Sequence, residues 1–281
     1  MFDEFIRSYN TFRDRGLEDP LVETLHLFDL LSEGSLNGIT ASPIEIPDFD
    51  VGRIAEARKR GMPLEYILGR AVFMGLTLQC TTNTLIPREE TALLVETTLG
   101  LIEERGGPEP RLIDVGTGCG NIAIAIALKA QSAKIHATDI DPDAVEVAKR
   151  NVDKFGLGQR VFLLCGDLLK PLSLKVLAGK LDIIVCNPPY IPTGSLQKLD
   201  PAITEHEPVL ALDAGSYGID IFRRLIKDAP PFLKEDGVLL FEIGAGQEKL
   251  VDMLFEKSGA FGNIRHYDDG KDVRVISAER K

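Results

Sequence analysis

Residues 111–121, Arg-Leu-Ile-Asp-Val-Gly-Thr-Gly-Cys-Gly-Asn, are the stretch that decides the fold of this chain. A short β-like run, Arg111–Val115, leads into a glycine-rich turn, and an Ala/Ile-rich helical run from Asn121 to Ala130 follows. Strand, glycine turn and helix in this order predict the first crossover of a Rossmann-type sheet. Glycines in such a turn let the backbone approach a ligand closely. The predicted cofactor-binding loop consists of Gly116, Thr117, Gly118, Cys119 and Gly120.

A carboxylate follows this loop at the separation that a nucleotide site requires. Asp139 ends the β-like run 134–138, about twenty residues past the glycine turn, where the acid of a Rossmann site meets ribose hydroxyls. Asp141-Pro142 then supplies a helix N-cap and a first helical residue. Asp139 is therefore a predicted cofactor ligand, although loop and acid together fit an NAD enzyme equally well.

The tetrad Asn187-Pro188-Pro189-Tyr190 distinguishes between these possibilities. It directly follows the apolar run 181–186, so we expect it at the carboxyl edge of the sheet, where open α/β sheets bind ligands. Each proline fixes φ at about −65° and lacks an N–H, so the carbonyls of Asn187 and Pro188 are rigid acceptors. Asn187 adds a side-chain acceptor, and the Tyr190 ring can lie against a flat conjugated group. The tetrad predicts a site that grips an NH₂ group.

Glycine loop, acid and tetrad, in this order, resemble the amino-group methyltransferases that use S-adenosylmethionine. Further segments narrow the resemblance to the family of release-factor glutamine methyltransferases. These segments are Pro63–Gly69, Leu85–Arg88, Glu207–Leu212 and Gly237–Gly244. The matching landmarks run from about Pro63 to the C-terminus. Glu89 departs from the family, which usually has a second proline there, so the helix expected near Glu90 loses a rigid first residue.

The resemblance implies a protein substrate and an adenine site. The chain would transfer a methyl group from S-adenosylmethionine to the side-chain nitrogen of the glutamine in the Gly-Gly-Gln loop of peptide-chain release factors. The turn after the expected strand 161–165 would lie beside the adenine ring. There Asp167 would accept from the exocyclic amine, and Leu168 would pack on the ring.

The tetrad suggests how the reaction proceeds. A carboxamide nitrogen is a poor nucleophile, because its lone pair is delocalised into the carbonyl. The Asn187 side-chain oxygen and the Pro188 carbonyl would each take one N–H and direct the lone pair at the methyl carbon, while Tyr190 fixes the amide plane. Such orientation can supply up to roughly 7–11 kcal/mol. The predicted catalytic residues are Asn187, Pro188 and Tyr190; the substrate-binding residues are Asn187, Pro188, Pro189 and Tyr190, with Asn187 also touching the cofactor.

Two other functions stay open at this point. The same tetrad serves enzymes that methylate an exocyclic amine of RNA or DNA, but a formal net charge of −11 and the lack of a basic or aromatic recognition domain count against this. A catalytically silent scaffold that binds S-adenosylmethionine is the third possibility, and the intact tetrad argues against it. No general base is visible, so we expect the final proton to leave to water.

Composition indicates a soluble intracellular enzyme. The chain has 281 residues, of which 44% are hydrophobic and 27% charged, a composition that is ordinary for a globular protein. No apolar run approaches the roughly 20 residues that span a bilayer, and the N-terminus lacks the basic region of a signal peptide. We therefore expect a cytoplasmic protein with no membrane association and no stable nucleic-acid binding. The four cysteines form no Cys-x-x-Cys pair and are expected to be buried, and the histidines lack ligand spacing, so no metal is expected.

The predicted fold class is α/β, a Rossmann-like methyltransferase sheet with a small N-terminal helical domain. Helices are expected up to Gly16, from the Asp19-Pro20 cap and from the Asp50 cap. We divide the chain into a helical substrate-docking domain (1–70), a hairpin linker (71–86) and the methyltransferase domain (87–281). Strands are expected near 111–115, 134–139, 161–165, 181–186, 238–243 and 273–277, and their alternation with helices predicts a mostly parallel sheet. Two acids near later strand ends, Glu242 and Asp272, are assigned structural roles.

Overall fold

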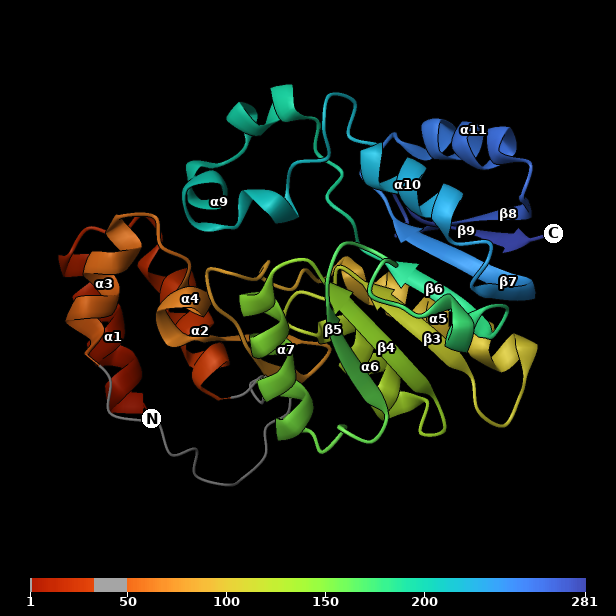
Figure 1. Ribbon diagram of the computed structural model, residues 1–281. Coiled ribbons are helices and arrows are strands. Elements are labelled where there is room, and N and C mark those ends of the chain that lie inside the picture. The colour runs from red at the N-terminus through yellow and green to blue at the C-terminus, as the bar shows by residue number, and fades with distance from the viewer. Residues whose placement is uncertain (1, 33–49) are drawn as a thin grey trace.

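The computed structural model describes residues 2–32 and 50–281, and consists of N-terminal helices, a two-stranded hairpin and a seven-stranded sheet with its helices (Figure 1). The Pro/Gly/Ser-containing stretch from Gly34 to Pro47 lies outside the described residues. The N-terminal helices are α1 (Phe2–Asp14), α2 (Pro20–Leu31), α3 (Val51–Lys59) and α4 (Leu64–Leu68). The predicted helices are all present, and Asp19 and Asp50 accept from the first backbone N–H groups of α2 and α3.

The sheet has the order β5-β4-β3-β6-β7-β9-β8, in which the first five strands run parallel, β9 runs antiparallel to β7, and β8 runs antiparallel to β9. Its strands are β3 (Arg111–Val115), β4 (Lys134–Asp139), β5 (Val161–Cys165), β6 (Leu181–Cys186), β7 (Leu233–Glu242), β8 (Phe261–Asp268) and β9 (Val273–Arg280). The predicted α/β fold class and parallel strands are confirmed. We did not predict β8, because this edge strand has a mixed burial pattern and an irregular register.

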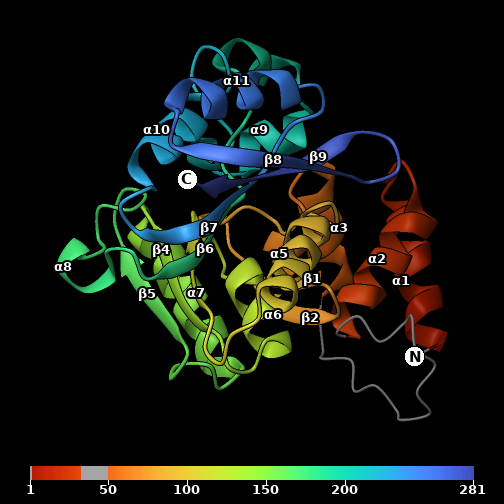
Figure 2. The ribbon, with the colours of Figure 1, turned by 90° about the vertical axis from the view of Figure 1, so that its right-hand side faces the viewer.

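Helices cover both faces of the sheet, each over its own apolar cluster (Figure 2). One face carries α5 (Thr91–Arg105), α6 (Asn121–Lys129) and α7 (Pro142–Lys154); the other carries α8 (Leu174–Leu177), α10 (Asp220–Asp228) and α11 (Glu248–Ser258). A long connection with the short helix α9 (Pro201–His206) joins β6 to α10. The strand order reverses between β3 and β6, which places the ligand crevice of such a sheet at their carboxyl ends.

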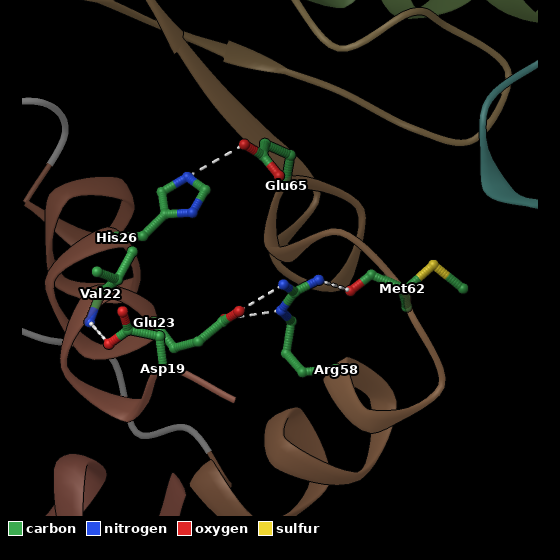
Figure 3. Close-up of polar contacts among 7 residues, drawn as sticks. All are labelled: Asp19, Val22, Glu23, His26, Arg58, Met62 and Glu65. Carbon is green, nitrogen blue, oxygen red and sulfur yellow. Dashed lines mark hydrogen bonds and ion pairs between the residues drawn. The ribbon is translucent and has the colours of Figure 1, made fainter. Parts of the chain in front are cut away.

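The N-terminal helices are joined by polar contacts as well as by a small apolar cluster (Figure 3). Arg58 of α3 donates through Nε to Glu23 Oε2 of α2 at 2.7 Å, and through Nη1 to the carbonyl of Met62 at 2.7 Å. His26 of α2 meets Glu65 of α4 at 3.1 Å. These contacts fix α2, α3 and α4 relative to one another.

The predicted hairpin is present as β1 (Arg70–Phe73) and β2 (Leu76–Gln79). The Asn151 side chain of α7 accepts from the Gln79 N–H at 2.7 Å and donates to the Gln79 carbonyl at 3.0 Å, as a neighbouring strand would. The Tyr66 hydroxyl of α4 donates to the carbonyl of Thr84 at 2.7 Å. Contacts from α7 and α4 therefore hold the end of the hairpin and the loop that leads into α5.

Two side observations concern cysteines and membranes. Cys80, Cys119 and Cys186 are buried, but the expectation of burial is wrong for Cys165, which is exposed at the end of the edge strand β5. Within residues 2–32 and 50–281, no helix combines the length and apolar character needed to cross a membrane.

Candidate functional site

The glycine loop between β3 and α6 is a turn that only glycine adopts readily. Gly116, Gly118 and Gly120 have φ values of 74°, 53° and 87°. The N–H groups of Gly116 and Thr117 donate to the Thr138 carbonyl at 2.8 and 2.9 Å, which folds the loop over the end of β4. A Cβ built on Gly116 or Gly118 would meet nothing within 4 Å, so conformation rather than space requires glycine there.

Two carboxylates hold this loop in place. Asp114 Oδ2 accepts from the Thr117 hydroxyl at 2.6 Å and from the Ala123 N–H at 3.2 Å, and complete burial raises the pKa of Asp114 to about 7. Asp139 Oδ2 accepts from the Gly118 N–H at 2.8 Å, and its Oδ1 accepts from the Asp141 N–H at 3.0 Å. Burial raises the pKa of Asp139 as well. Asp139 thus connects the glycine loop with the start of α7.

A cavity of about 200 Å³ lies at the carboxyl ends of β3, β4 and β6. Most of the predicted site residues line it: Gly116, Gly118, Asp139, Asp167, Leu168, Asn187, Pro188 and Pro189. Four predicted residues do not line it: Thr117, Cys119, Gly120 and Tyr190. Thr117 and Cys119 are buried behind the loop, because their side chains point into the protein interior. Open glycine backbone, a carboxylate acceptor and the apolar Leu168 fit a nucleoside-bearing cofactor.

Other walls of the cavity come from segments far away in the sequence. They are the loop after the hairpin (Asn83, Thr84, Leu85), the β6–α10 connection (Pro208, Leu210, Ala211) and α10 (Ile221, Arg224). An ion pair between Arg88 and the buried Glu207 ties the first two segments together. Residues 85–88 and 207–212 were recognised only as family landmarks. We predicted no role for them, because neither segment carries a recognisable ligand-binding pattern of its own.

Asp167 has charged partners that we did not predict. Arg224 Nη2 donates to Asp167 Oδ1 at 2.6 Å, and Lys170 Nζ donates to Oδ2 at 2.7 Å. The contact with Lys170, supported by Arg224, lowers the pKa of Asp167 below its ordinary value. The carboxylate therefore stays ionised and anchors the turn after β5 to α10.

The tetrad follows β6 without a break, and its side chains have different environments. Asn187 Nδ2 donates to the Thr91 hydroxyl of α5 at 3.1 Å, while Asn187 Oδ1 accepts no hydrogen bond from residues that the structure describes. The Tyr190 carbonyl accepts from Gln247 Nε2 at 2.9 Å. Burial, and next the Glu242 charge, raise the pKa of Tyr190. A Cβ on Gly218 would lie 2.5 Å from the Tyr190 carbonyl oxygen, so only glycine fits beside this turn.

Glu242 and Asp272, the two acids assigned structural roles, lie in different surroundings. Asp272 is exposed in the β8–β9 turn, where its N–H donates to Asp269 Oδ1 at 3.0 Å. Glu242 is only 1% exposed and lies beside Asn187 and Thr91. The sequence signal that could have found Glu242 is its place at the end of a strand, but adjacency of β7 to β6 is visible only in the sheet.

Comparisons with known proteins identify the family of this chain. Residues 90–204 match the family model described as "Methyltransferase small domain". The chain is 42% identical over 244 residues to the release factor glutamine methyltransferase of Moorella thermoacetica, covering 84% of this chain and 83% of that protein. It is 35% identical over 284 residues to the release factor glutamine methyltransferase of Agrobacterium fabrum, covering 99% and 96%. The chain belongs to the release factor glutamine methyltransferase family.

Membership in the release factor glutamine methyltransferase family confirms that the chain is a methyltransferase with S-adenosylmethionine as its cofactor. Among solved structures, the hMettl16 catalytic domain in complex with MAT2A 3'UTR hairpin 1 matches with a TM-score of 0.58 and 18% identity, covering 73% of this chain and 75% of that one. At this identity the likeness supports the fold alone. It says nothing about which substrate the present enzyme takes.

Proposed function

We propose that this enzyme transfers a methyl group from S-adenosylmethionine to the side-chain nitrogen of the glutamine in the Gly-Gly-Gln loop of peptide-chain release factors. The names of its relatives support this substrate. The observation that carries the proposal is the Asn187 amide. Its nitrogen is engaged by Thr91, whereas its oxygen has no partner within the described residues and belongs to a side chain that lines the cavity.

The residues of the tetrad would orient and activate the substrate amide. The Asn187 oxygen and the Pro188 carbonyl each accept one N–H, which draws the nitrogen lone pair out of conjugation with the carbonyl. Tyr190, largely buried and held through its carbonyl by Gln247, fixes the plane of the amide. S-adenosylmethionine, when bound, supplies an electrophilic methyl group on a sulfonium. The proton released from the nitrogen leaves to water.

The loop and the two aspartates would bind the cofactor. The Gly116 and Gly118 backbone lies against it, Asp139 accepts from the ribose hydroxyls, and Asp167 and Leu168 contact the adenine. Thr117, Cys119 and Gly120, which were also predicted as cofactor residues, support the loop from behind. Asp139 is already oriented by two backbone donors, so little order remains to be gained when the cofactor binds.

We further propose that residues 1–70 form the domain that docks the release factor, with 71–86 as a linker and 87–281 as the methyltransferase domain. A Gly-Gly-Gln loop offers too little area for a specific interface by itself. The outer face of α2 offers additional area, since Leu21, Val22 and Leu25 are 50%, 58% and 48% exposed. A net charge of −11 supports our view that nucleic acid is no stable partner, and the cytoplasm stays the predicted location.

Methyl transfer with labelled cofactor tests the function. Intact release factor should be labelled on the Gly-Gly-Gln glutamine, and a release factor with asparagine in its place should not, because its amide is one methylene short. Mass spectrometry of the product locates the label. Label on RNA or DNA would favour the nucleic-acid methyltransferase, and label on another amino acid would favour a different protein substrate. No transfer to any macromolecule would favour a catalytically silent scaffold.

A double substitution on α2 tests the docking role. Leu21→Ser with Leu25→Ser should raise the apparent KM for intact release factor about fivefold, since lost apolar contacts weaken an interface. Transfer to a short Gly-Gly-Gln peptide, which cannot reach α2, is the control and should not change. Equal KM values for parent and variant on intact release factor would remove this face from the docking surface.

A further inference from the structure

Glu242, the last residue of β7, and Asn187, the first residue after β6, lie side by side at the carboxyl edge of the sheet. β6 and β7 are parallel neighbours in a register that pairs Cys186 with Phe241, so the next residue of each strand stands beside the other. Thr91, the first residue of α5, lies over both and accepts the Asn187 Nδ2–H. Thr91 and Glu242 are each 1% exposed, which shields the group from water.

The Glu242 carboxyl is a buried hydrogen-bond acceptor beside Asn187 at the carboxyl edge of the sheet. The side chains of Thr91 and Asn187 both lie beside it and lower its pKa, against the effect of burial. Its Oε2 is buried and has no partner among residues 2–32 and 50–281. An ionised carboxylate can only accept, so it is matched by the Thr91 hydroxyl proton and by an Asn187 N–H.

The orientation of Asn187 matters because its amide has two ends of nearly the same shape. With the nitrogen inward, Oδ1 is available to accept from the substrate NH₂. With the amide flipped, an NH₂ group would face the substrate NH₂, and two donors would oppose each other. Shape hardly distinguishes the two states, so polar partners must select one.

We propose that Glu242, acting with Thr91, is the positioning residue that holds the Asn187 amide with its nitrogen inward and its oxygen toward the reacting substrate nitrogen. The identity of that nitrogen rests on the function proposed above. In the flipped state Oδ1 would face a carboxylate without a proton to share, in a site from which water is excluded. Removing the carboxylate therefore affects the reaction through Asn187 alone.

The protonation state of Glu242 should control this orientation. Burial raises the pKa of Glu242 to about 7; Thr91, Arg274 of β9 and Asn187 oppose this rise, whereas the nearby Glu90 adds to it. A protonated Glu242 can donate to Oδ1 and so tolerates the flipped amide. Transfer should consequently decline as the pH falls through the pKa of Glu242. Glu242→Gln, which does not titrate there, should lack this dependence.

Kinetics on full-length enzyme and intact release factor test the proposal. Glu242→Gln and Thr91→Val should each lower kcat at least about tenfold with both KM values within about threefold of the parent, and Thr91→Ser should restore most of the loss. In an Asn187→Ala background Glu242→Gln should cause no further loss. Asp182→Asn, at the opposite end of β6, is the matched control and should keep the parental kcat. Parental kcat in Glu242→Gln, or the same loss in both backgrounds, would overturn the proposal.

A measurement without substrate separates this inference from the function. The Asn187 side-chain amide is identified in a ¹⁵N spectrum as the signal missing from Asn187→Ala. In the parent it should shift with an ionisation near pH 7, and in Glu242→Gln it should not; an Asn187 signal that ignores pH in the parent would contradict the inference. Should Glu242→Gln fail to fold, Thr91→Val carries the same kinetic expectations. If the parent enzyme does not methylate release factor, the proposed function is wrong. The pH dependence of the Asn187 signal then still decides whether Glu242 positions Asn187.

Discussion

On the β3–β4 side of the catalytic edge, Asp139 receives its hydrogen bonds from the backbone of Gly118 and Asp141, within the continuous stretch from β3 to the start of α7. On the β6–β7 side, Asn187 donates to Thr91, which is 96 residues away in the chain, and lies beside Glu242 on another strand. The β3–β4 side, the local half of the site, is therefore organised within one stretch of sequence. The β6–β7 side, the assembled half, brings together separate parts of the chain.

This difference separates binding from reaction. A local binding unit keeps its geometry when packing elsewhere changes, because its hydrogen bonds come from its own backbone. An assembled reacting group depends on how α5 and β7 pack against β6. Substitutions in the two halves should therefore affect different constants, and the following experiments test that separation.

The largest expected effect belongs to the assembled half. Asn187→Ala should reduce methyl transfer about a hundredfold or more, as loss of one preorganised polar contact in an active site does. Affinity for S-adenosylhomocysteine, measured by calorimetry, should stay within a few-fold of the parent. Asn187→Asp, which keeps an acceptor but adds charge near the sulfonium, should bind cofactor more tightly and alter the rate. Transfer by Asn187→Ala at the parental rate would contradict the role of Asn187 as a hydrogen-bond acceptor for the substrate amide.

The local half should show the opposite pattern. Asp139→Ala should weaken binding of S-adenosylhomocysteine at least about tenfold, because charge-assisted hydrogen bonds contribute about 1.5–3 kcal/mol each. Asp153→Ala, on the exposed face of α7, removes a charge without touching the loop and should leave the affinity unchanged. Calorimetric titration compares the three proteins. An affinity equal to the parent's in Asp139→Ala would remove this residue from the site.

A smaller effect is expected where α10 supports the cofactor side. Arg224→Ala should weaken cofactor binding about threefold, since it frees the Asp167 turn from α10 while leaving the Asp139 contacts in place. The transfer rate at saturating cofactor should not change. Lys170→Ala is the matched control, because Lys170 is 72% exposed and its ion pair is screened by water. A lower saturated rate in Arg224→Ala would show that the two halves are coupled.

The smallest effect lies outside both sides of the site, among the N-terminal helices. The hydrogen bond to Glu65 raises the pKa of His26 above its ordinary value of 6.5. Protonated His26 thus stabilises the fold below that value, and the contribution is lost as pH rises through the higher folded-state pKa. His26→Gln should lower the free energy of unfolding by about 0.5 kcal/mol or less at pH 6 and by nearly nothing at pH 8.5. Urea unfolding at both pH values measures this, and a difference that grows with pH would contradict it.

The sequence by itself determined the parts of this protein whose physics is local. Positive φ strongly favours glycine, so the three closely spaced glycines Gly116, Gly118 and Gly120 mark the loop. Proline removes donors and fixes φ, so the tetrad identifies its own rigid acceptors. Apolar periodicity and capping aspartates likewise predicted most strands and the N-terminal helices.

Only the tertiary structure decided which groups support the reaction. A buried polar group needs a partner, and any residue that lies next to it in space can serve, wherever it stands in the chain. Glu242 beside Asn187 and Arg224 on Asp167 are of this kind, and the cavity walls at 83–85, 208, 210 and 211 likewise come from distant segments. Their residue types carry no local pattern, and only packing of β6 between β3 and β7 brings them to one edge.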